Sequence, residues 1–380
     1  MKWENKSLDE LGEVSRGRSK HRPRNDSVLF GGEYPFVQTA DVKKANLYLT
    51  EYTTTYNEKG LEQSKLWKAG TLCITIAANI ADTAVLGIDA CFPDSIMGFV
   101  PYEDKANVFF IKYSFDLLQR ECKNISQGTA QDNLSWEKLS TIKFRIPSID
   151  SQNKIAEILV SYDNLIENNQ KQIKLLEEAA QRLYKEWFVD LRFPGWENTE
   201  IVDGVPNGWR KDCVGNIIGS ISRTKQIKTS DYQKTGDIPI IDQSRDFIAG
   251  YTDDKESIVD MDMPVIVFGD HTRILKYIQF PFAKGADGTQ LIISKLDVMP
   301  QCLLYCGLVN IDLSNFHYAR HFKYLKAEEI LVPNKEMAAN FENIVNPIFS
   351  QVQNLRDISI KAEEARNRLL PKLMNGELEV

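Results

Sequence analysis

The sequence lacks the marks of a membrane or secreted protein. No run of apolar side chains among its 380 residues approaches the roughly 18 that suggest a membrane span, and the first ten residues, MKWENKSLDE, contain no apolar stretch. The six cysteines are scattered, and the spacing of Cys302 and Cys306 is not that of a zinc or redox site. We therefore expect a cytoplasmic protein with reduced thiols.

Patterns of catalysis are missing too. The chain shows no serine–histidine–aspartate set, no P-loop and no histidine or cysteine cluster for a metal. A net charge of −7 argues mildly against a nucleic-acid partner, because such proteins usually carry a basic surface. The charge is uneven, however, since Arg16–Arg24 contains five cations and no acidic residue. The sequence therefore offers no candidate active site of these kinds.

A long amphipathic helix is predicted in the middle of the chain. Apolar residues there form two rows with a spacing of seven, which indicates a coiled-coil seam over about five heptads. Ile146-Pro147 predicts an extended start, after which Asp150 or Ser151 can cap the helix. Phe193-Pro194-Gly195 marks its exit, so the helix has roughly 35 residues and a length of about 50 Å. The two rows are Ile155, Tyr162, Asn169, Leu176 and Leu183, and Leu159, Ile166, Ile173, Ala180 and Trp187.

The pattern returns 186 residues later, where Val332-Pro333 takes the place of Ile146-Pro147 and Asn334 is the expected cap. Pro347 should kink this second helix, and Ser359 and Arg366 weaken its partner row. We expect the two helices to pack antiparallel. Asn169 then either sets their register within the seam or lies solvated at its edge. The second seam comprises Phe341, Ile348, Leu355, Ala362 and Leu369.

The regions before the two helices also correspond to each other. Residues 3–144 are interpreted as short strands, such as Thr71–Ala77 and Val108–Ile111, joined by long loops, with a short helix at Leu8–Val14. Residues 209–332 repeat this order, with Pro264–Gly269 in the place of Thr71–Ala77. The predicted fold class is α+β, with two mixed α/β domains separated by two long antiparallel coiled-coil helices in a pseudo-twofold tandem repeat. The predicted segments are residues 1–146, 147–195, 196–331 and 332–380.

Polar and basic loops stand at matching places in the two repeats. The loop Arg16–Arg24 and its counterpart Ser222–Lys228 either contact phosphates or are ordinary solvated turns. The loops that follow the strands at Pro35 and Pro239 carry glutamine, threonine and arginine, which can read base edges, or they are plain turns. A two-fold repeat suits DNA because two equivalent modules can read two half-sites. The candidate DNA contacts are Arg16, Arg18, Lys20, Arg22, Gln38, Thr39, Asp41, Asn79, Arg223, Lys225, Gln243, Arg245, His271 and Arg273.

A succession of short motifs runs through the whole chain. The motifs are Gly128-Thr129-Ala130-Gln131, Gln152-x-x-Ile155, Leu183-Tyr184-x-x-Trp187-Phe188, Pro206-x-Gly208-Trp209 and the tail Leu373-Met374-Asn375-Gly376-Glu377-Leu378. In this order they resemble the specificity subunits of type I restriction–modification systems. One departure is Tyr318-Ala319-Arg320-His321-Phe322, which stands where the first repeat has its Gly-x-Ala-Gln sequence. The resemblance adds Gln131, Gln290 and Arg320 to the candidate DNA contacts.

The resemblance implies a non-catalytic subunit that binds DNA sequence-specifically. Each domain is expected to read one half of a bipartite target, with the helices setting the gap between the halves. The resemblance also implies two methylation subunits that use S-adenosylmethionine and dock on the outer helix faces near Glu177 and Glu178. It further implies restriction subunits that hydrolyse ATP with Mg²⁺. No cofactor is expected in this chain itself.

Two other classes of protein compete with this interpretation. Asp94, Glu103 and Lys105 fit a loose pattern of an autonomous Mg²⁺-dependent endonuclease, in which carboxylates hold the metal and a lysine stabilises developing charge. A coiled-coil scaffold without any DNA role is the other class. Asn346-Pro347-Ile348-Phe349 resembles the tetrapeptide of amino-methyltransferases, but no glycine-rich cofactor loop precedes it.

Overall fold

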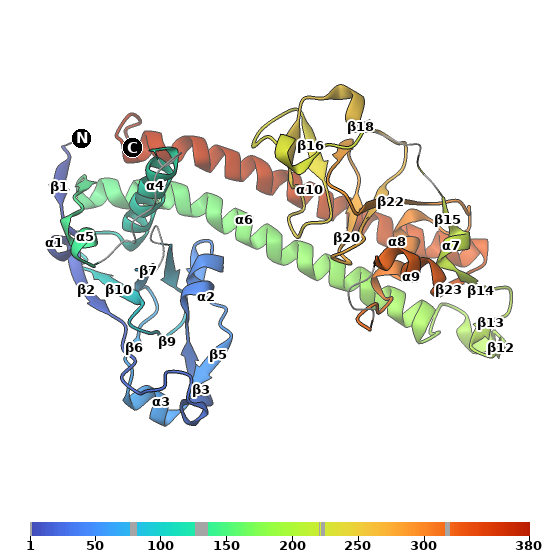
Figure 1. Ribbon diagram of the computed structural model, residues 1–380, viewed down its shortest axis with the longest axis horizontal. Helices are drawn as coiled ribbons and strands as arrows, with labels where there is room; N and C mark the ends of the chain where they lie inside the picture. The colour runs from blue at the N-terminus through green and yellow to red at the C-terminus, as the bar shows by residue number, and fades with distance from the viewer. Residues whose placement is uncertain (1, 77–81, 126–135, 220, 222–224, 316–319) are drawn as a thin grey trace. The chain divides into compact units, whose positions relative to one another are not determined.

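The computed structural model describes residues 2–76, 82–125, 136–219, 221, 225–315 and 320–380. The chain divides into two compact units. The first unit comprises Met1–Asn168 and Ile358–Val380, and the second comprises Asn169–Asp357. The long helices α6 (Ile149–Tyr184) and α10 (Lys335–Met374) each contribute one end to each unit (Figure 1). The predicted boundaries at residues 146, 195 and 331, which separate helices from globular domains, stay a prediction.

The first unit contains two main sheets and one strand pair. Its five-stranded sheet has the order β2 (Gly12–Arg16), β10 (Ile96–Pro101), β7 (Leu72–Thr75), β8 (Thr83–Leu86) and β4 (Tyr48–Leu49). Its four-stranded sheet has the order β5 (Thr54–Tyr56), β3 (Phe30–Phe36), β9 (Ala90–Cys91) and β6 (Leu66–Trp67). The strand pair joins β1 (Glu4–Lys6) to β11 (Phe144–Ile146). The chain therefore enters and leaves this domain side by side.

The second unit repeats this plan, which confirms the predicted tandem repeat. One sheet has the order β15 (Ile218–Gly219), β22 (Thr289–Ser294), β19 (Val265–Gly269) and β20 (Leu275–Ile278). The other has the order β17 (Gly250–Thr252), β16 (Ile238–Ile241), β21 (Phe282–Lys284) and β18 (Ile258–Val259). Strand β14 (Arg210–Cys213) pairs with β23 (Glu329–Val332), as β1 pairs with β11, and β12 (Ile201–Val202) forms a hairpin with β13 (Val205–Pro206). Even the parallel pair recurs, because β3 runs parallel to β9 and β16 runs parallel to β21.

Short helices complete each unit. The first unit has α1 (Leu8–Leu11), α2 (Thr39–Lys44), α3 (Glu58–Glu62), α4 (Val108–Ile125) and α5 (Trp136–Thr141), and the second has α7 (Val214–Ile217), α8 (Gln301–Val309) and α9 (His321–Ala327). The predicted helix at Leu8–Val14 is too long, because Gly12 starts β2 and Val14 pairs with Phe99. A capping box between Ser7 and Glu10 fixes the start of α1, and its hydrogen bonds lower the pKa of Glu10 to about 2.

The predicted strand at Val108–Ile111 is wrong, because these residues begin helix α4. The Asn107 side chain accepts hydrogen bonds from the backbone N–H groups of Phe109 and Phe110, at 2.9 and 3.1 Å, and so caps the helix. A run of four apolar residues does not distinguish a strand from a buried helix, and the asparagine before it was the signal that decides. Phe110 and Ile111 pack in the first unit's core with Leu72 and Phe99 of the sheet.

The long helices begin as follows. Helix α6 starts one residue after Ser148, whose hydroxyl accepts from the Ser151 N–H at 3.4 Å, so the expected cap at Asp150 or Ser151 is wrong by two or three positions. The cap predicted at Asn334 is confirmed, since its side chain accepts from the Met337 N–H at 2.8 Å. Helix α10 continues through Pro347, and a kink at that residue stays a prediction.

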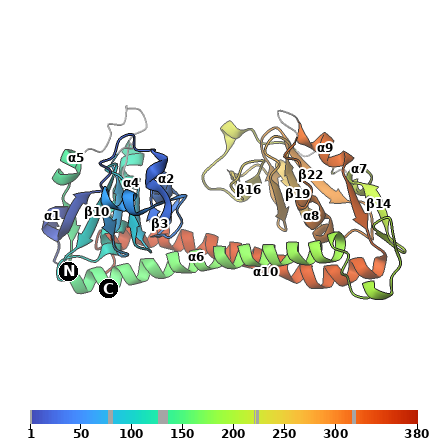
Figure 2. The same ribbon diagram turned by 90° about the horizontal axis from the view of Figure 1, so that it is seen from below.

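The two helices pair antiparallel within each unit (Figure 2). In the first unit, Ile155 and Leu159 of α6 share a core with Leu370 and Leu373 of α10. In the second unit, Tyr184 of α6 packs against Phe341 near the start of α10, with ring centroids 6.3 Å apart. All ten predicted seam positions, nine in α6 and Trp187 in the π-helical turn Lys185–Val189 that follows it, are buried or half-buried, which confirms the seam. Asn169 is only 3% exposed, so it lies within the seam rather than solvated at its edge.

Polar contacts also join the helices. In the first unit, the buried Asp163 of α6 forms an ion pair with Arg366 of α10 and accepts a hydrogen bond from the Tyr113 hydroxyl. In the second unit, Arg356 of α10 lies 2.5 Å from a carboxylate oxygen of Glu177. Arg366 was expected only to weaken the apolar row, but it has a dedicated partner across the helix pair.

Candidate nucleic-acid interface

The basic loop of the first unit leaves β2 and is fixed through its backbone. Gly17 N–H donates to the Ile96 carbonyl at 2.8 Å, and Arg18 N–H donates to the Phe92 carbonyl at 3.1 Å. The Gln63 side chain then accepts from two successive N–H groups, those of Lys20 and His21. A side chain at Gly17 would overlap backbone oxygens, so this close approach requires glycine.

The five cations of this loop divide into two groups. Arg16, Arg18 and Lys20 are exposed on the anchored backbone. Arg22 instead donates to the Ser19 carbonyl at 2.7 Å, and Arg24 forms an ion pair of 2.6 Å with Asp94. The first three side chains are therefore the better candidates for phosphate contacts, because their charges project from a rigid loop.

The loop after β3 leads into helix α2. Asp41 accepts from the Gln38 N–H at 2.8 Å in a capping box, so this predicted DNA contact serves the helix start. The Gln38 side chain is exposed, with its amide 3.5 Å from the Thr54 hydroxyl, and Thr39 is half-buried. Gln38 is thus the side chain of this group that is best placed to meet a ligand.

In the second unit, Gln243 joins three loops. Its side-chain amide donates to the Asp287 carbonyl at 2.8 Å, and its side-chain oxygen accepts from the His271 N–H at 3.2 Å. The Thr272 hydroxyl donates to the Gln243 backbone carbonyl at 2.7 Å. Gln243 was predicted to read a base, but both ends of its amide bond within the protein. Its geometry is that of a support for the neighbouring loops.

The loop at 270–273 presents two exposed candidates, His271 and Arg273. Arg273 adopts a left-handed backbone conformation, with φ of 63°, and donates to the Leu313 carbonyl at 3.0 Å. The buried Asp270 anchors the loop to α9, because its carboxylate accepts from the Phe322 N–H at 2.8 Å. Arg320, the residue before α9, is exposed beside this anchor.

The remaining predicted contacts differ in their surroundings. Lys225 forms an ion pair of 2.7 Å with Asp254, and this hydrogen bond raises the pKa of Lys225. Its charge is therefore largely balanced within the unit. Arg245 is exposed, and Gln290 is half-buried on β22. Asn79, Gln131 and Arg223 lie outside the residues that the structure describes.

Strand register shows that the two units place equivalent turns at this site. Ile96 of β10 faces Thr75 of β7, and Thr289 of β22 faces Gly269 of β19. Ile96 and Thr289 therefore occupy equivalent positions in the two units. Asp94 lies two residues before Ile96 and Asp287 lies two residues before Thr289, so the two aspartates are equivalent as well. Asp287 accepts from the Gln226 amide at 3.1 Å, as Asp94 binds Arg24. Sequence reasoning missed this match because the turns share almost no residues.

The same geometry removes the endonuclease interpretation. Asp94 and Glu103 lie beyond opposite ends of the six-residue strand β10, which spans about 20 Å. Asp94 is engaged by Arg24, and no group of carboxylates, histidines or cysteines suited to a metal occurs among the described residues. Two carboxylates so far apart cannot share one Mg²⁺ ion.

Comparison with known proteins agrees with the repeat. The family model described as "Type I restriction modification DNA specificity domain" matches residues 1–178. The MjaIX specificity subunit of Methanocaldococcus jannaschii is 24% identical over 100% of this chain and 94% of its own length. The chain is thus similar over its whole length to a specificity subunit of a type I restriction enzyme. The HindI specificity subunit of Haemophilus influenzae is 26% identical, over 47% of this chain and 40% of its own.

A solved structure shares the fold of this chain. The S subunit of a type I restriction–modification system from M. genitalium superposes with a TM-score of 0.62 at 13% identity, covering 98% of this chain and 96% of its own. The relatives that the chain matches are named as specificity subunits. No helix in the described parts of the chain is long and apolar enough to cross a membrane.

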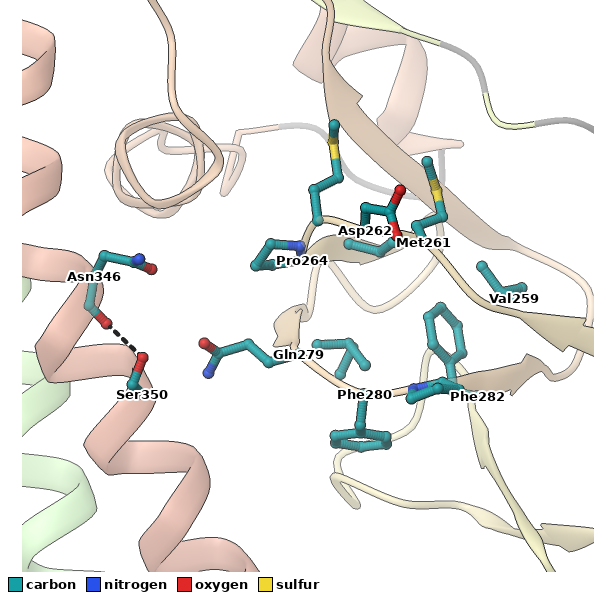
Figure 3. Close-up of a pocket in the computed structure, with 13 residues that line it drawn as sticks. Val259, Met261, Asp262, Pro264, Gln279, Phe280, Phe282, Asn346 and Ser350 are labelled. Atoms are coloured by element: carbon teal, nitrogen blue, oxygen red, sulfur yellow. Dashed lines mark hydrogen bonds between the residues drawn. The ribbon is translucent and has the colours of Figure 1, made fainter.

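A cavity of about 260 Å³ lies in the second unit, away from the candidate interface (Figure 3). Asn346 and Ser350 line it from α10, and Gln279 faces them from the sheet side. It sits at the Val265 end of β19, whereas the loop at 270–273 follows the other end. Asn346 belongs to the methyltransferase-like tetrapeptide, but the next residues lie inside the continuous helix α10, with Phe349 buried. The cavity therefore gives no support to a methyltransferase site.

Proposed function

We propose that each unit of this specificity subunit reads one half of a bipartite DNA target through the loops described above. The observation that supports the proposal is the repetition of the same loop cluster in both units. In the first unit Arg24, from the loop after β2, binds Asp94. In the second unit Gln226 and Gln243, which follow β15 and β16, bind Asp287. Exposed Arg16, Arg18 and Lys20 supply phosphate contacts, which fix register, and the other loops supply contacts to base edges.

The test is selection from random DNA. The chain, assembled with its methylation partners, is incubated with a randomised duplex library, and the bound DNA is sequenced. We expect two blocks of preferred bases separated by a gap of constant length. A single block, or no base preference at all, would contradict the proposal. The second outcome would favour a scaffold without a reading role.

We further propose that two methylation subunits, which use S-adenosylmethionine, dock on the outer faces of α6 and α10, and that restriction subunits, which use ATP and Mg²⁺, join the complex. Glu177, which we expected to mark this surface, instead faces Arg356 of the neighbouring helix. Better markers are two exposed apolar side chains of the second unit, Leu175 and Ile344, which are 64% and 46% exposed. They are the most exposed large apolar side chains among the described residues of α6 and α10, and exposed apolar surface is one mark of a partner site.

Leu175→Lys should weaken assembly with the methylation subunits without changing the folding of the chain. An exposed position away from the core changes the free energy of unfolding by only about 0.5 kcal/mol, so a large change in assembly reports a contact. The measurement is the stoichiometry of co-purified subunits, with Lys174→Glu on the adjacent exposed position as the control. Unchanged stoichiometry for Leu175→Lys would place the docking surface elsewhere.

The gap between the two half-sites should depend on the length of α6. A continuous helix of 36 residues is stiff and covalent, so it is suited to define a distance. From its length of about 54 Å we expect roughly 5–8 unread base pairs between two blocks of roughly three to five.

Inserting four residues after Glu178 adds one helical turn, or about 6 Å, and should lengthen the preferred gap by roughly one or two base pairs. The same random-library selection measures the change, and both blocks of preferred bases should stay as they are. A four-residue insertion in the loop before Trp209, outside α6, is the control. An active insertion variant that kept the original gap would show that α6 does not set it.

A further inference from the structure

A lysine is buried in the second unit beneath the candidate interface. Lys276 lies on β20 and is 5% exposed. Its ammonium group donates to the Asp246 carbonyl at 2.5 Å and lies 4.0 Å from a carboxylate oxygen of the equally buried Asp242. Burial lowers the pKa of Lys276, which reflects the cost of removing a charge from water. A buried charge of this kind requires an explanation.

The fold itself does not require it. Within the repeat, the strand pair β7–β8 corresponds to β19–β20, and Cys73 faces Ala84 where Val267 faces Lys276. The pairing of β10 with β7 and of β22 with β19, described above for the turns at Asp94 and Asp287, fixes this match. Ala84 is fully buried, so the same position in the sister domain is filled by a small apolar residue. Only the second unit keeps a charge at this position.

Lys276 and Asp242 belong to a network that ends in the candidate loops. Asp242 accepts from the Ser244 N–H at 2.9 Å and from the Tyr232 hydroxyl at 3.2 Å. The Tyr232 oxygen in turn accepts from the Ala286 N–H at 2.8 Å, in the turn that carries Asp287. Both ends of the loop Asp242–Asp246 are therefore held, and Gln243 between them holds the next two loops.

We propose that Lys276 is a positioning residue, whose charge holds the loop Asp242–Asp246 and the turn at Ala286 in the conformation that reads DNA. The proposal rests on the proposed function of the second unit. Lys276 is too deeply buried to touch DNA itself, so it acts through the residues that the loop presents, above all the exposed Arg245. The base preference of the second unit in its half-site then depends on a side chain that makes no contact with the DNA.

The experiment replaces the charge but keeps the aliphatic stem, with Lys276→Met in the full chain assembled with its partner subunits. We expect the base preference in one half-site to fall on the order of tenfold, the effect of losing one good base contact. The preference in the other half-site and the salt dependence of binding should not change. Lys295→Met, an exposed lysine of the same unit, is the matched control.

The readouts separate positioning from general stability. A purely structural role would lower the amount of active complex and weaken binding to all sequences alike, and this result would overturn the proposal, as would an unchanged preference in both half-sites. If Lys276→Met does not fold, Ser244→Ala removes only the hydroxyl that donates to Asp242 at 2.5 Å and tests the same network. A wild-type complex without any base preference would refute the proposed function instead.

Discussion

Asp163→Ala should destabilise the first unit by roughly 3–5 kcal/mol, the usual cost of removing one partner of a buried ion pair. Asp163 is 5% exposed, and its loss leaves the Arg366 guanidinium and the Tyr113 hydroxyl in the helix interface without their common acceptor. Urea unfolding of the full chain, followed by circular dichroism, measures the loss. A change below about 1 kcal/mol would show that water reaches this site and solvates the arginine.

The double substitution Asp163→Leu with Arg366→Met should recover most of that stability. Counted by the repeat interval from Pro147 to Pro333, the second unit has Phe349 and Ala180 at the equivalent positions, both buried and apolar. Replacing both ions by apolar side chains of similar size is often neutral or stabilising. The double-mutant cycle isolates their coupling, and additive losses would mean that the two residues do not interact.

Replacing Arg16, Arg18 and Lys20 with alanine should weaken DNA binding roughly a hundredfold at 0.15 M salt. Three phosphate contacts contribute about 2.7 to the slope of log K against log salt concentration, and this slope should fall by that amount. The affinity of the assembled complex for its preferred DNA is measured at salt concentrations from about 0.05 to about 0.3 M. These measurements give both the loss of affinity and the change in slope. Base preference in both half-sites should be retained.

The matched control removes three exposed or partly exposed cations of the same unit, Lys6, Lys105 and Lys154. Lys6 precedes β2 and Lys105 follows β10, so both lie at the strand ends opposite to the basic loop. An equal fall in slope for both triple variants would mean that the loop has no special role and that only the total charge matters.

The sequence predicts well those features that depend on local periodicity. The apolar spacing of α6 repeats over about five heptads, so its seam can be predicted from spacing alone. The cap at Asn334 and the tandem order follow from the second copy of the same pattern, 186 residues later. Val108–Ile111 was misassigned because four apolar residues are too few to show a period. The site was harder to predict. Gln243 has the residue type of a base reader, and its role as a support depends on His271 and Asp287, which only the fold brings beside it.

Arg366 and Lys276 illustrate the same limit. In the sequence, Arg366 is an interruption of an apolar row, and its partner Asp163 lies 203 positions away. Lys276 stands in a strand whose alternation predicts nothing about Asp242 or Asp246. A buried charge is recognised only when its partner, its burial and the equivalent position in the other unit are known. The register between strands identifies that equivalent position.

The first unit begins the chain but is the last to have all of its residues synthesised. Domains generally fold as the ribosome releases them, from the amino terminus onward at roughly 5–20 residues per second. Here the first unit includes Ile358–Val380, and its core contains Leu370, Leu373 and Met374. The second unit, a single stretch from Asn169 to Asp357, is complete earlier. A chain that ends near residue 357 therefore contains every residue of the second unit but lacks part of the core of the first.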